Sequence, residues 1–159
     1  MINYEIRKMK VEELSTLCQL FKYGDVNAMI DENTKGILEN SCSIFILLVE
    51  GKLIGELHVK FNSEDNREAI PNKRAYLFAY RIDKDFQGKG WGKLLLNNVI
   101  HILENDGYRE FTIGVEDDNS MAKHIYWSFG FRETVARKTE SYQGVNYSYD
   151  LLLRETTNK

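Results

Sequence analysis

The strongest constraint in the sequence is a run of three alternating glycines, Gly88, Gly90 and Gly92, directly before an apolar helix pattern. Alternating glycines leave backbone N–H groups bare of side chains, so an anion can approach the main chain closely. A helix that begins behind such a loop adds its unpaired first-turn N–H groups and its positive dipole end. Because the extended, aromatic-rich segment 74–82 leads into the glycines, the stretch predicts a strand, a phosphate-binding loop and a helix in succession.

Two familiar phosphate-binding fingerprints are excluded by the residues around the glycines. The dinucleotide pattern G-x-G-x-x-G would need a glycine where Lys93 stands. The nucleoside-triphosphate pattern G-x-x-x-x-G-K-[ST] would need a glycine at Gln87 and a magnesium-binding hydroxyl at Leu94. The loop is therefore predicted to hold a phosphate group, but the chain is not predicted to be a nucleotide hydrolase.

Length and composition narrow the class of protein. The 159 residues suit a single domain over 1–159 with its own core. The net charge of -3 gives no basic footprint for nucleic acid. The apolar run 44–49 is far shorter than the about 20 residues that span a membrane. Residues 1–5 do not resemble a secretion signal, and Cys18 and Cys42 lack metal-ligand spacing. We therefore expect a cytoplasmic protein with no metal, disulfide or membrane partner.

Hydrophobic periodicity predicts the elements of the first half. A half-buried strand is expected over 2–8, followed by a helix with Leu14, Leu17, Cys18 and Phe21 on one face. Segment 23–40 predicts a second, irregular helix. Strands are predicted over 43–50, 52–61 and 73–82, with a turn at Gly51 and a polar loop over 62–72.

The second half alternates helices with strands. The helix behind the glycines is expected to bury Trp91, Leu94, Leu95, Val99, Ile102 and Leu103, and Gly107 is expected to end it. A strand over 111–115 and a short helix to Phe129 follow, and strands 131–140 and 145–153 close the chain around a turn at Gln143-Gly144. Residues 154–159 are expected to fray. Hairpins in the first half and a strand–helix–strand unit in the second predict an α/β fold with a mixed sheet.

A second motif lies at residues 119–131, which read Asn-Ser-Met-Ala-Lys-His-Ile-Tyr-Trp-Ser-Phe-Gly-Phe. This stretch resembles the Asn-x-x-Ala-x-x-x-Tyr-x-x-x-Gly-Phe signature of the GNAT superfamily of N-acetyltransferases. Gln87, Gly90 and Gly92 likewise resemble the family's Gln/Arg-x-x-Gly-x-Gly/Ala loop. The motifs stand in the family's order, and the resemblance covers essentially the whole chain. It implies the acyl-CoA N-acyltransferase fold, a central mixed sheet flanked by helices, with strands splayed at the cofactor cleft.

The resemblance also implies a reaction and a set of site residues. The reaction is direct transfer of an acetyl group from acetyl-coenzyme A, without a metal, to a primary amine. The pyrophosphate is assigned to Gln87, Gly88, Lys89, Gly90, Trp91, Gly92 and Lys93. The pantetheine arm is assigned to the backbone of Tyr80, Arg81 and Ile82, with Asn119 on its other side. Tyr126 takes the role of the general acid that protonates the departing thiolate.

The general base is not marked by the resemblance. Better-marked branches of the family carry a glutamate on the strand before the glycine loop, but segment 73–82 contains no carboxylate. Glu56 and Glu116 are the candidate bases, and His58 shares a strand face with Glu56. A chain of water molecules that relays the proton is an equal alternative.

The acceptor amine is predicted from charge alone. Acidic residues in segment 23–40, together with Glu64, Asp65 and Glu68, suit a small cationic amine such as a polyamine or an aminoglycoside. The alternatives are a protein N-terminus or lysine as acceptor, or a non-catalytic module that senses acyl-coenzyme A. The intact motif with Tyr126 favours the enzyme, and a homodimer is left open.

Overall fold

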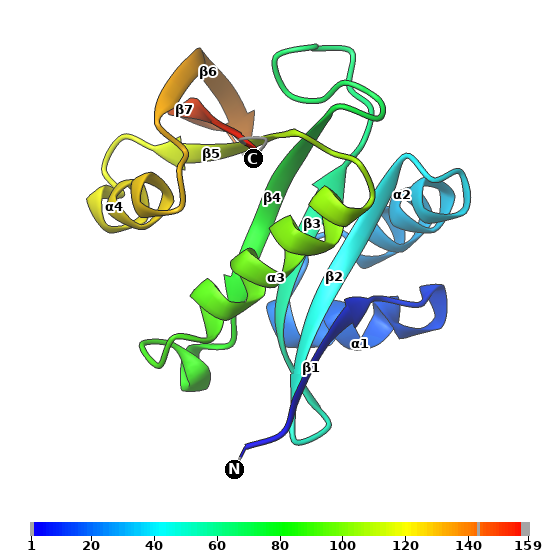
Figure 1. Cartoon of the computed structure of the whole chain (residues 1–159). Coiled ribbons are helices and arrows are strands. Elements are labelled where there is room, and N and C mark those ends of the chain that lie inside the picture. The colour runs from blue at the N-terminus through cyan, green and yellow to red at the C-terminus, as the bar shows by residue number, and fades with distance from the viewer. Residues whose placement is uncertain (1, 143, 157–159) are drawn as a thin grey trace. The chain divides into compact units, whose positions relative to one another are not determined.

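The structure is a computed structural model that describes residues 2–142 and 144–156, within which a mixed seven-stranded sheet and four α-helices are found. The strands are ordered β1-β2-β3-β4-β5-β7-β6. Figure 1 labels the elements, which are β1 (Tyr4–Lys8), α1 (Leu14–Phe21), α2 (Val26–Leu38), β2 (Cys42–Val49), β3 (Lys52–Lys60), β4 (Arg74–Ile82), α3 (Trp91–Asn105), β5 (Glu110–Glu116), α4 (Ser120–Ser128), β6 (Glu133–Tyr142) and β7 (Val145–Glu155). The predicted fold class and order of elements are confirmed, while Gln143 of the predicted last turn lies outside the described residues.

The chain forms two compact units. The first contains Met1–Lys60 and Ala79–Ile102, and the second contains Phe61–Phe78 and Leu103–Lys159. Strand β4 and helix α3 each contribute residues to both units. A single domain over 1–159 stays a prediction.

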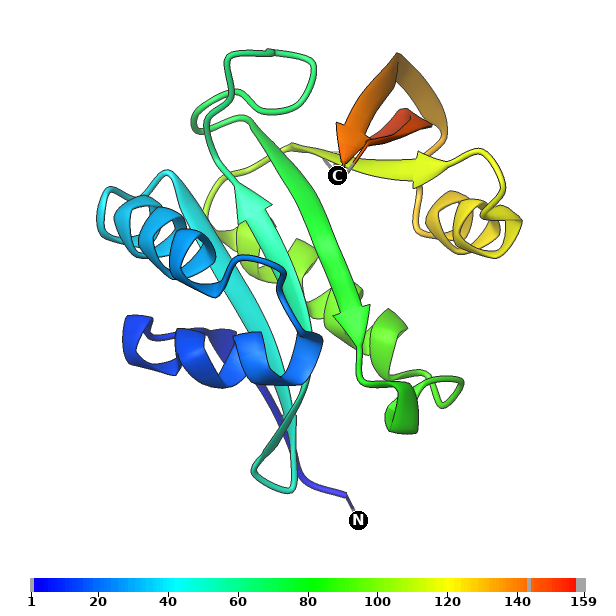
Figure 2. The same ribbon diagram turned by 180° about the vertical axis from the view of Figure 1, so that it is seen from behind.

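The first unit places its helices on both faces of antiparallel strands. Strand β2 pairs with β1 and β3, and α1 and α2 cover one face while α3 covers the other (Figure 1 and Figure 2). Ile44 and Ile46 share a buried cluster with Leu14, Leu17 and Cys18 of α1. Because side chains alternate along a strand, this register fixes which residues of β3 face the two helices.

The buried face of α3 differs from the prediction. Fully buried are Leu95, Leu96, Val99, Ile100 and Leu103, whereas the predicted Trp91, Leu94 and Ile102 are half-buried. The observed stripe is rotated by about one residue. Three consecutive leucines at 94–96 satisfy either phase of a 3.6-residue period, so the pattern alone did not fix which of them faces the sheet.

The last strand of the second unit, β7, continues further toward the C-terminus than predicted. Strand β7 pairs with β5 and β6, and β4 runs parallel to β5 over Arg74–Leu77. Arg154 pairs with Phe111 although residues 154–156 were expected to fray, and the Thr156 N–H donates to the Arg109 carbonyl at 2.7 Å. The reason is that β5 supplies backbone partners to the end of β7. Residues 157–159 lie outside the described residues.

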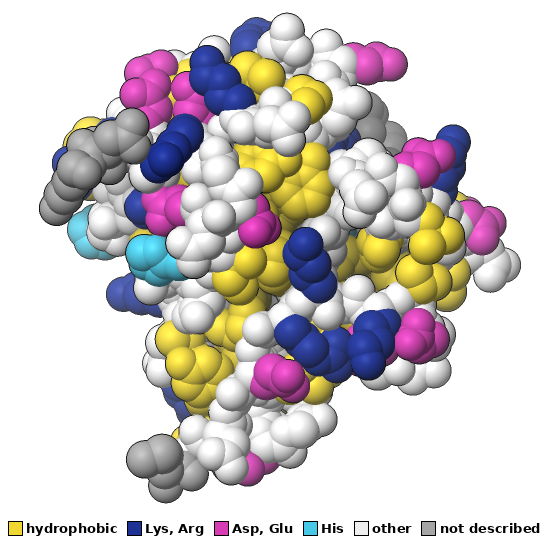
Figure 3. Space-filling model, turned by 45° about the vertical axis from the view of Figure 1, so that its right-hand side comes forward, with side chains coloured by type: hydrophobic (Ala, Val, Ile, Leu, Met, Phe, Trp, Pro, Cys, Tyr) yellow, Lys and Arg dark blue, Asp and Glu magenta, His cyan; other side chains and the backbone are white. Residues whose placement is uncertain are grey.

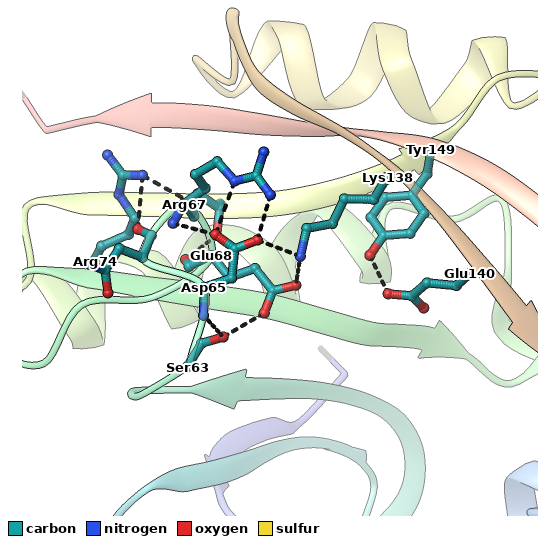
Figure 4. Close-up of polar contacts among 10 residues, drawn as sticks. Ser63, Asp65, Arg67, Glu68, Arg74, Lys138, Glu140 and Tyr149 are labelled. Atoms are coloured by element: carbon teal, nitrogen blue, oxygen red, sulfur yellow. Dashed lines mark hydrogen bonds and ion pairs between the residues drawn. The ribbon is translucent and has the colours of Figure 1, made fainter.

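A network of charges fastens the loop before β4 to β6, as Figure 4 shows. The Lys138 Nζ lies 2.5 Å from a Glu68 carboxylate oxygen and 2.9 Å from an Asp65 oxygen. Arg67 donates to Asp65, and Thr112 of β5 donates to the Glu68 carbonyl at 2.6 Å. Two of the three loop carboxylates that suggested a cationic acceptor are therefore already neutralised within the chain.

None of the helices described between residues 2 and 156 is long and apolar enough to cross a membrane. Among the same residues, no group of three or more His, Cys, Asp or Glu side chains is arranged to hold a metal ion. Basic and acidic side chains both occur on the face drawn in Figure 3. The cytoplasmic location and the homodimer stay predictions.

An ion pair between β1 and the turn before α1 predicts how stability depends on pH. Arg7 donates two bonds of 2.8 and 2.7 Å to Glu13, and these bonds lower the pKa of Glu13 from 4.5 to about 2. A carboxyl whose pKa is lowered by folding stabilises above its unfolded pKa, and that stabilisation disappears as the pH falls from about 4.5 to about 2. Glu13→Gln should cost about 1 kcal/mol at pH 7.

Denaturant unfolding at pH 7, 4 and 2 checks this expectation. The free-energy difference between wild type and Glu13→Gln should shrink as the pH falls through this range. The matched control is Glu12→Gln, since Glu12 is the exposed neighbour. A difference that stays constant from pH 7 to pH 2 would show that the ion pair does not stabilise the fold.

Candidate functional site

The glycine loop has an accessible main chain. Gly88 and Gly90 have φ of 76° and 89°, a left-handed conformation that residues with a side chain rarely adopt. A Cβ at either position would meet nothing within 4 Å. The first backbone hydrogen bond of helix α3 runs from the Leu94 N–H to the Gly90 carbonyl, at 3.1 Å. The N–H groups that precede this bond lack helical acceptors, and together with the positive helix end they suit an anion.

Gln87 shapes the loop through its side chain. A short 3₁₀ turn over Lys84–Phe86, which the sequence analysis did not predict, connects β4 to the glycines. The Gln87 Nε2 donates to the Ile82 carbonyl at 2.9 Å, and the Asp83 N–H donates to the Ile54 carbonyl of β3 at 2.7 Å. The loop is therefore held to two strands before any ligand binds.

The third glycine, Gly92, packs closely against Tyr80. A Cβ on Gly92 would lie 3.0 Å from the Tyr80 hydroxyl, which donates to the Gly92 carbonyl. The Trp91 ring packs edge-on against Tyr4 of β1, with ring centroids 6.0 Å apart. Tyr80 and Trp91 thus contact the first turn of α3 and its surroundings with their side chains. Lys89 and Lys93 are exposed.

Strand β4 contains a backbone outlier at Ala79, immediately before the residues predicted to face the pantetheine arm. Ala79 has φ of 47°, which is uncommon for a residue other than glycine, asparagine or aspartate. Such outliers inside a strand interrupt the alternation of side chains and re-aim the residues that follow. The backbone of Tyr80, Arg81 and Ile82 is therefore presented differently from that of a regular strand.

A pocket of about 460 Å³ lies in the first unit. It is lined by the end of α1, the end of β4 and the loop, namely Leu20, Phe21, Lys22, Tyr80, Arg81, Ile82, Asp83, Lys84 and Gln87. Four residues predicted to bind the co-substrate, Tyr80, Arg81, Ile82 and Gln87, therefore share one cavity. Phe21 and Lys22 were not among the predicted site residues.

A buried network lies directly behind this pocket. Glu56 of β3 has no exposed surface, and the register that opposes it to Ile46 turns it toward α1 and α2. Its Oε1 accepts from the Tyr23 hydroxyl at 2.7 Å and lies 2.5 Å from the His58 Nε2. Its Oε2 accepts from the Arg81 Nε at 2.7 Å. Burial, and then the charge of Glu56, raise the pKa of Tyr23, so its hydroxyl stays protonated and donates.

The buried network surrounds Glu56, one of the two candidate bases. Its role as a general base stays a prediction, but both oxygens of its carboxylate already accept hydrogen bonds and it has no exposed surface. Glu56 therefore anchors Arg81 and Tyr23. Sequence reasoning missed Tyr23 and the side chain of Arg81, although two polar residues at positions 56 and 58 of one buried strand face already indicated that partners were needed.

The second motif lies in the second unit. Asn119 caps α4, since its side-chain oxygen accepts from the Ala122 N–H at 3.1 Å. Tyr126 is half-buried, its ring lies edge-on to Phe131 at 6.1 Å, and burial raises its pKa to about 12. Glu116, the other candidate base, is exposed at the end of β5. Asn119 and Tyr126 therefore have structural contacts that coexist with the predicted roles, and those roles stay predictions.

Comparison with known proteins gives one family match and several relatives. The model of the acetyltransferase (GNAT) family matches residues 9–131. A [ribosomal protein bS18]-alanine N-acetyltransferase from Salmonella typhimurium is 32% identical over 87 residues, which are 52% of this chain and 59% of that protein. A spermine/spermidine N(1)-acetyltransferase from Bacillus subtilis is 32% identical over 111 residues, 64% of this chain and 70% of that protein. The alignment with the first relative thus spans less than two thirds of it.

A solved structure shares the fold. It is an acetyltransferase-fold protein from Salmonella typhimurium determined with its cofactor acetyl-CoA, with a TM-score of 0.73 and 16% identity. The superposition covers 98% of this chain and 95% of that one. At this identity the likeness concerns the fold, and it agrees with the predicted mixed-sheet architecture.

Proposed function

This chain belongs to the GNAT family of acetyltransferases, and we propose that it transfers the acetyl group of acetyl-CoA to a primary amine. The observation that carries the proposal is the open glycine loop, whose main chain is accessible at Gly88 and Gly90. Such a loop before a helix suits the pyrophosphate of coenzyme A, and the bare N–H groups between Gln87 and Lys93 are its proposed donors. When bound, acetyl-CoA supplies an acetyl group activated as a thioester.

Tyr126 is the proposed donor to the departing sulfur. A pKa of about 12 keeps its hydroxyl protonated at neutral pH, but it also makes the phenol a weaker acid than a thiol with a pKa near 8.5. Complete proton transfer to a thiolate is therefore uphill. We infer that the hydroxyl acts mainly through a hydrogen bond that strengthens as negative charge develops on sulfur.

The buried network around Glu56 reduces the choice of general base for the acceptor amine. Because the Glu56 carboxylate is enclosed by Tyr23, His58 and Arg81, we propose that the proton leaves through Glu116 or through water. Glu116 is exposed and can exchange a proton with solvent. Glu116→Gln should therefore slow the reaction most at low pH, where a smaller fraction of the acceptor amine is unprotonated.

The acceptor has two supported candidates. A small cationic amine is supported by the Bacillus subtilis relative, whose name gives spermine and spermidine as its substrates. A peptide N-terminus is supported by the Salmonella typhimurium relative, whose name gives an alanine of a ribosomal protein. Release of free coenzyme A thiol, measured with a panel of amines, tests the function. A chain that binds acetyl-CoA but acetylates no amine would instead be a sensor module.

Gly90→Val is expected to weaken acetyl-CoA binding about tenfold or more. Valine at a φ of 89° is strained, and its branched side chain would cover the N–H groups proposed to hold the pyrophosphate. Calorimetry on the folded variant measures the affinity. The matched control is Gly51→Val in the β2–β3 turn, where φ is 78° and the surroundings are equally open. This control should lose stability but keep its affinity, and equal affinity in both variants would show that the loop is misassigned.

Tyr126→Phe is expected to lower kcat about 100-fold while the affinity for acetyl-CoA changes little. The ring and its packing against Phe131 remain, so only the proposed hydrogen bond to sulfur is lost. Steady-state kinetics together with calorimetry separate the two effects. Tyr108→Phe is the control, because Tyr108 is another half-buried tyrosine packed against a phenylalanine, Phe61. Full kcat in folded Tyr126→Phe would leave this tyrosine with a packing role alone.

A further inference from the structure

The guanidinium of Arg81 is held in one orientation at the wall of the pocket. Its centre lies 5.0 Å from the Phe21 ring centroid and 4.7 Å from that of Tyr23. Its Nε and Nη2 lie 2.7 and 2.6 Å from one oxygen of Glu56. The Arg81 side chain is nevertheless 40% exposed. Two aromatic rings and a buried carboxylate therefore orient the group, and its outer edge can donate to a molecule in the pocket.

The charges that line the pocket favour an electron-rich ligand. Lys22 and Lys84 line it together with Arg81. Asp83 is the one carboxylate among the described lining residues, and its side chain caps the 3₁₀ turn by accepting from the Asp85 N–H at 3.4 Å. The carboxylate of Glu56 lies behind Arg81, and this side chain has no exposed surface. The pocket thus presents positive charge and hydrogen-bond donors.

This chemistry discriminates between the two candidate acceptors. A guanidinium donates hydrogen bonds and accepts none. A polyamine carries cationic ammonium groups, which would be repelled and could not accept from Arg81. An amine with a carbonyl or carboxylate on its α-carbon offers an oxygen acceptor three bonds from the nitrogen. The planar, charged fork of arginine suits such an oxygen better than a flexible ammonium group does.

We propose that Arg81 is a specificity-determining residue that binds the carbonyl or carboxylate oxygen of the acceptor, so that the acceptor is an α-amino carbonyl compound, an amino acid or a peptide N-terminus. The inference rests on the proposed acetyl transfer and deepens it. Glu56 and Tyr23 are positioning residues, because they act on the acceptor only by orienting the guanidinium. The small cationic amine predicted from composition is then the poorer acceptor.

Matched amines test the proposal. Alaninamide and isopropylamine differ in that only the first carries a carbonyl beside the amine-bearing carbon, and alanine replaces the amide with a carboxylate. Wild type should acetylate alaninamide or alanine with a higher kcat/KM than isopropylamine or spermidine. The better of the first two tells a peptide N-terminus from a free amino acid. Arg81→Gln should lower kcat/KM for the preferred acceptor about 10- to 100-fold more than it lowers kcat/KM for isopropylamine, which has no oxygen for the guanidinium to bind.

Two further variants protect the test from a folding artefact. Arg81→Gln leaves a buried carboxylate without its cation, so the double variant Arg81→Gln/Glu56→Gln is measured beside it to restore a neutral hydrogen-bonded pair. Arg7→Gln is the control, since it also breaks an arginine–glutamate pair of the first unit but lies outside the pocket lining. The double variant should keep the loss of selectivity, and Arg7→Gln should keep the wild-type selectivity.

Binding measurements separate this proposal from the proposed function. Calorimetry with alaninamide and alanine should show binding to wild type that is lost in the double variant, while the affinity for acetyl-CoA, which Arg81 is predicted to contact through its backbone, falls by a much smaller factor. If binding depends on Arg81 but no amine is acetylated, the site stands and the acetyl transfer fails. If spermidine is preferred, or if the double variant loses acetyl-CoA affinity by the same factor, the transfer stands and the assignment of Arg81 is overturned.

Discussion

A buried carboxylate governs the arrangement of the first unit. A charged group without exposed surface is costly in a protein interior unless it is paired and hydrogen-bonded, and Glu56 has no exposed surface. The partners of the Glu56 carboxylate are Arg81 from the end of β4, Tyr23 from the segment after α1, and His58 from the same strand. Strand β3, the end of β4 and the segment after α1 therefore meet at the Glu56 carboxylate. The pocket is lined by the end of α1 and the end of β4.

The order of elements could be predicted from the sequence because hydrophobic period and glycine positions are local signals. Gly51 and the glycines of the loop mark turns whose backbone conformation excludes most other residues. The resemblance then assigned the family from two motifs that lie far apart in the chain. Long-range pairing was less accessible, since the end of β7 is ordered by β5, some 40 residues earlier in the sequence.

The chemistry of individual side chains was the least predictable level. The sequence placed Glu56 and His58 on one strand face, but it contained no sign that Arg81 would turn its side chain toward them. Gly92 was grouped with the anion-binding glycines, and no sequence signal indicated that a Cβ there would lie 3.0 Å from the Tyr80 hydroxyl. In each case the deciding partner comes from a different element, and side-chain contacts between elements leave no periodic trace in a sequence.

The glycine loop has a consequence for how freely this part of the chain can vary. Its proposed anion donors are peptide N–H groups, which every amino acid except proline carries. Exchanging Lys89 or Lys93 therefore alters the local charge but removes no donor, whereas a proline there would. Selection at such a site acts on backbone dihedral angles. Two chains could therefore share the same loop conformation while differing in most of the loop's residues.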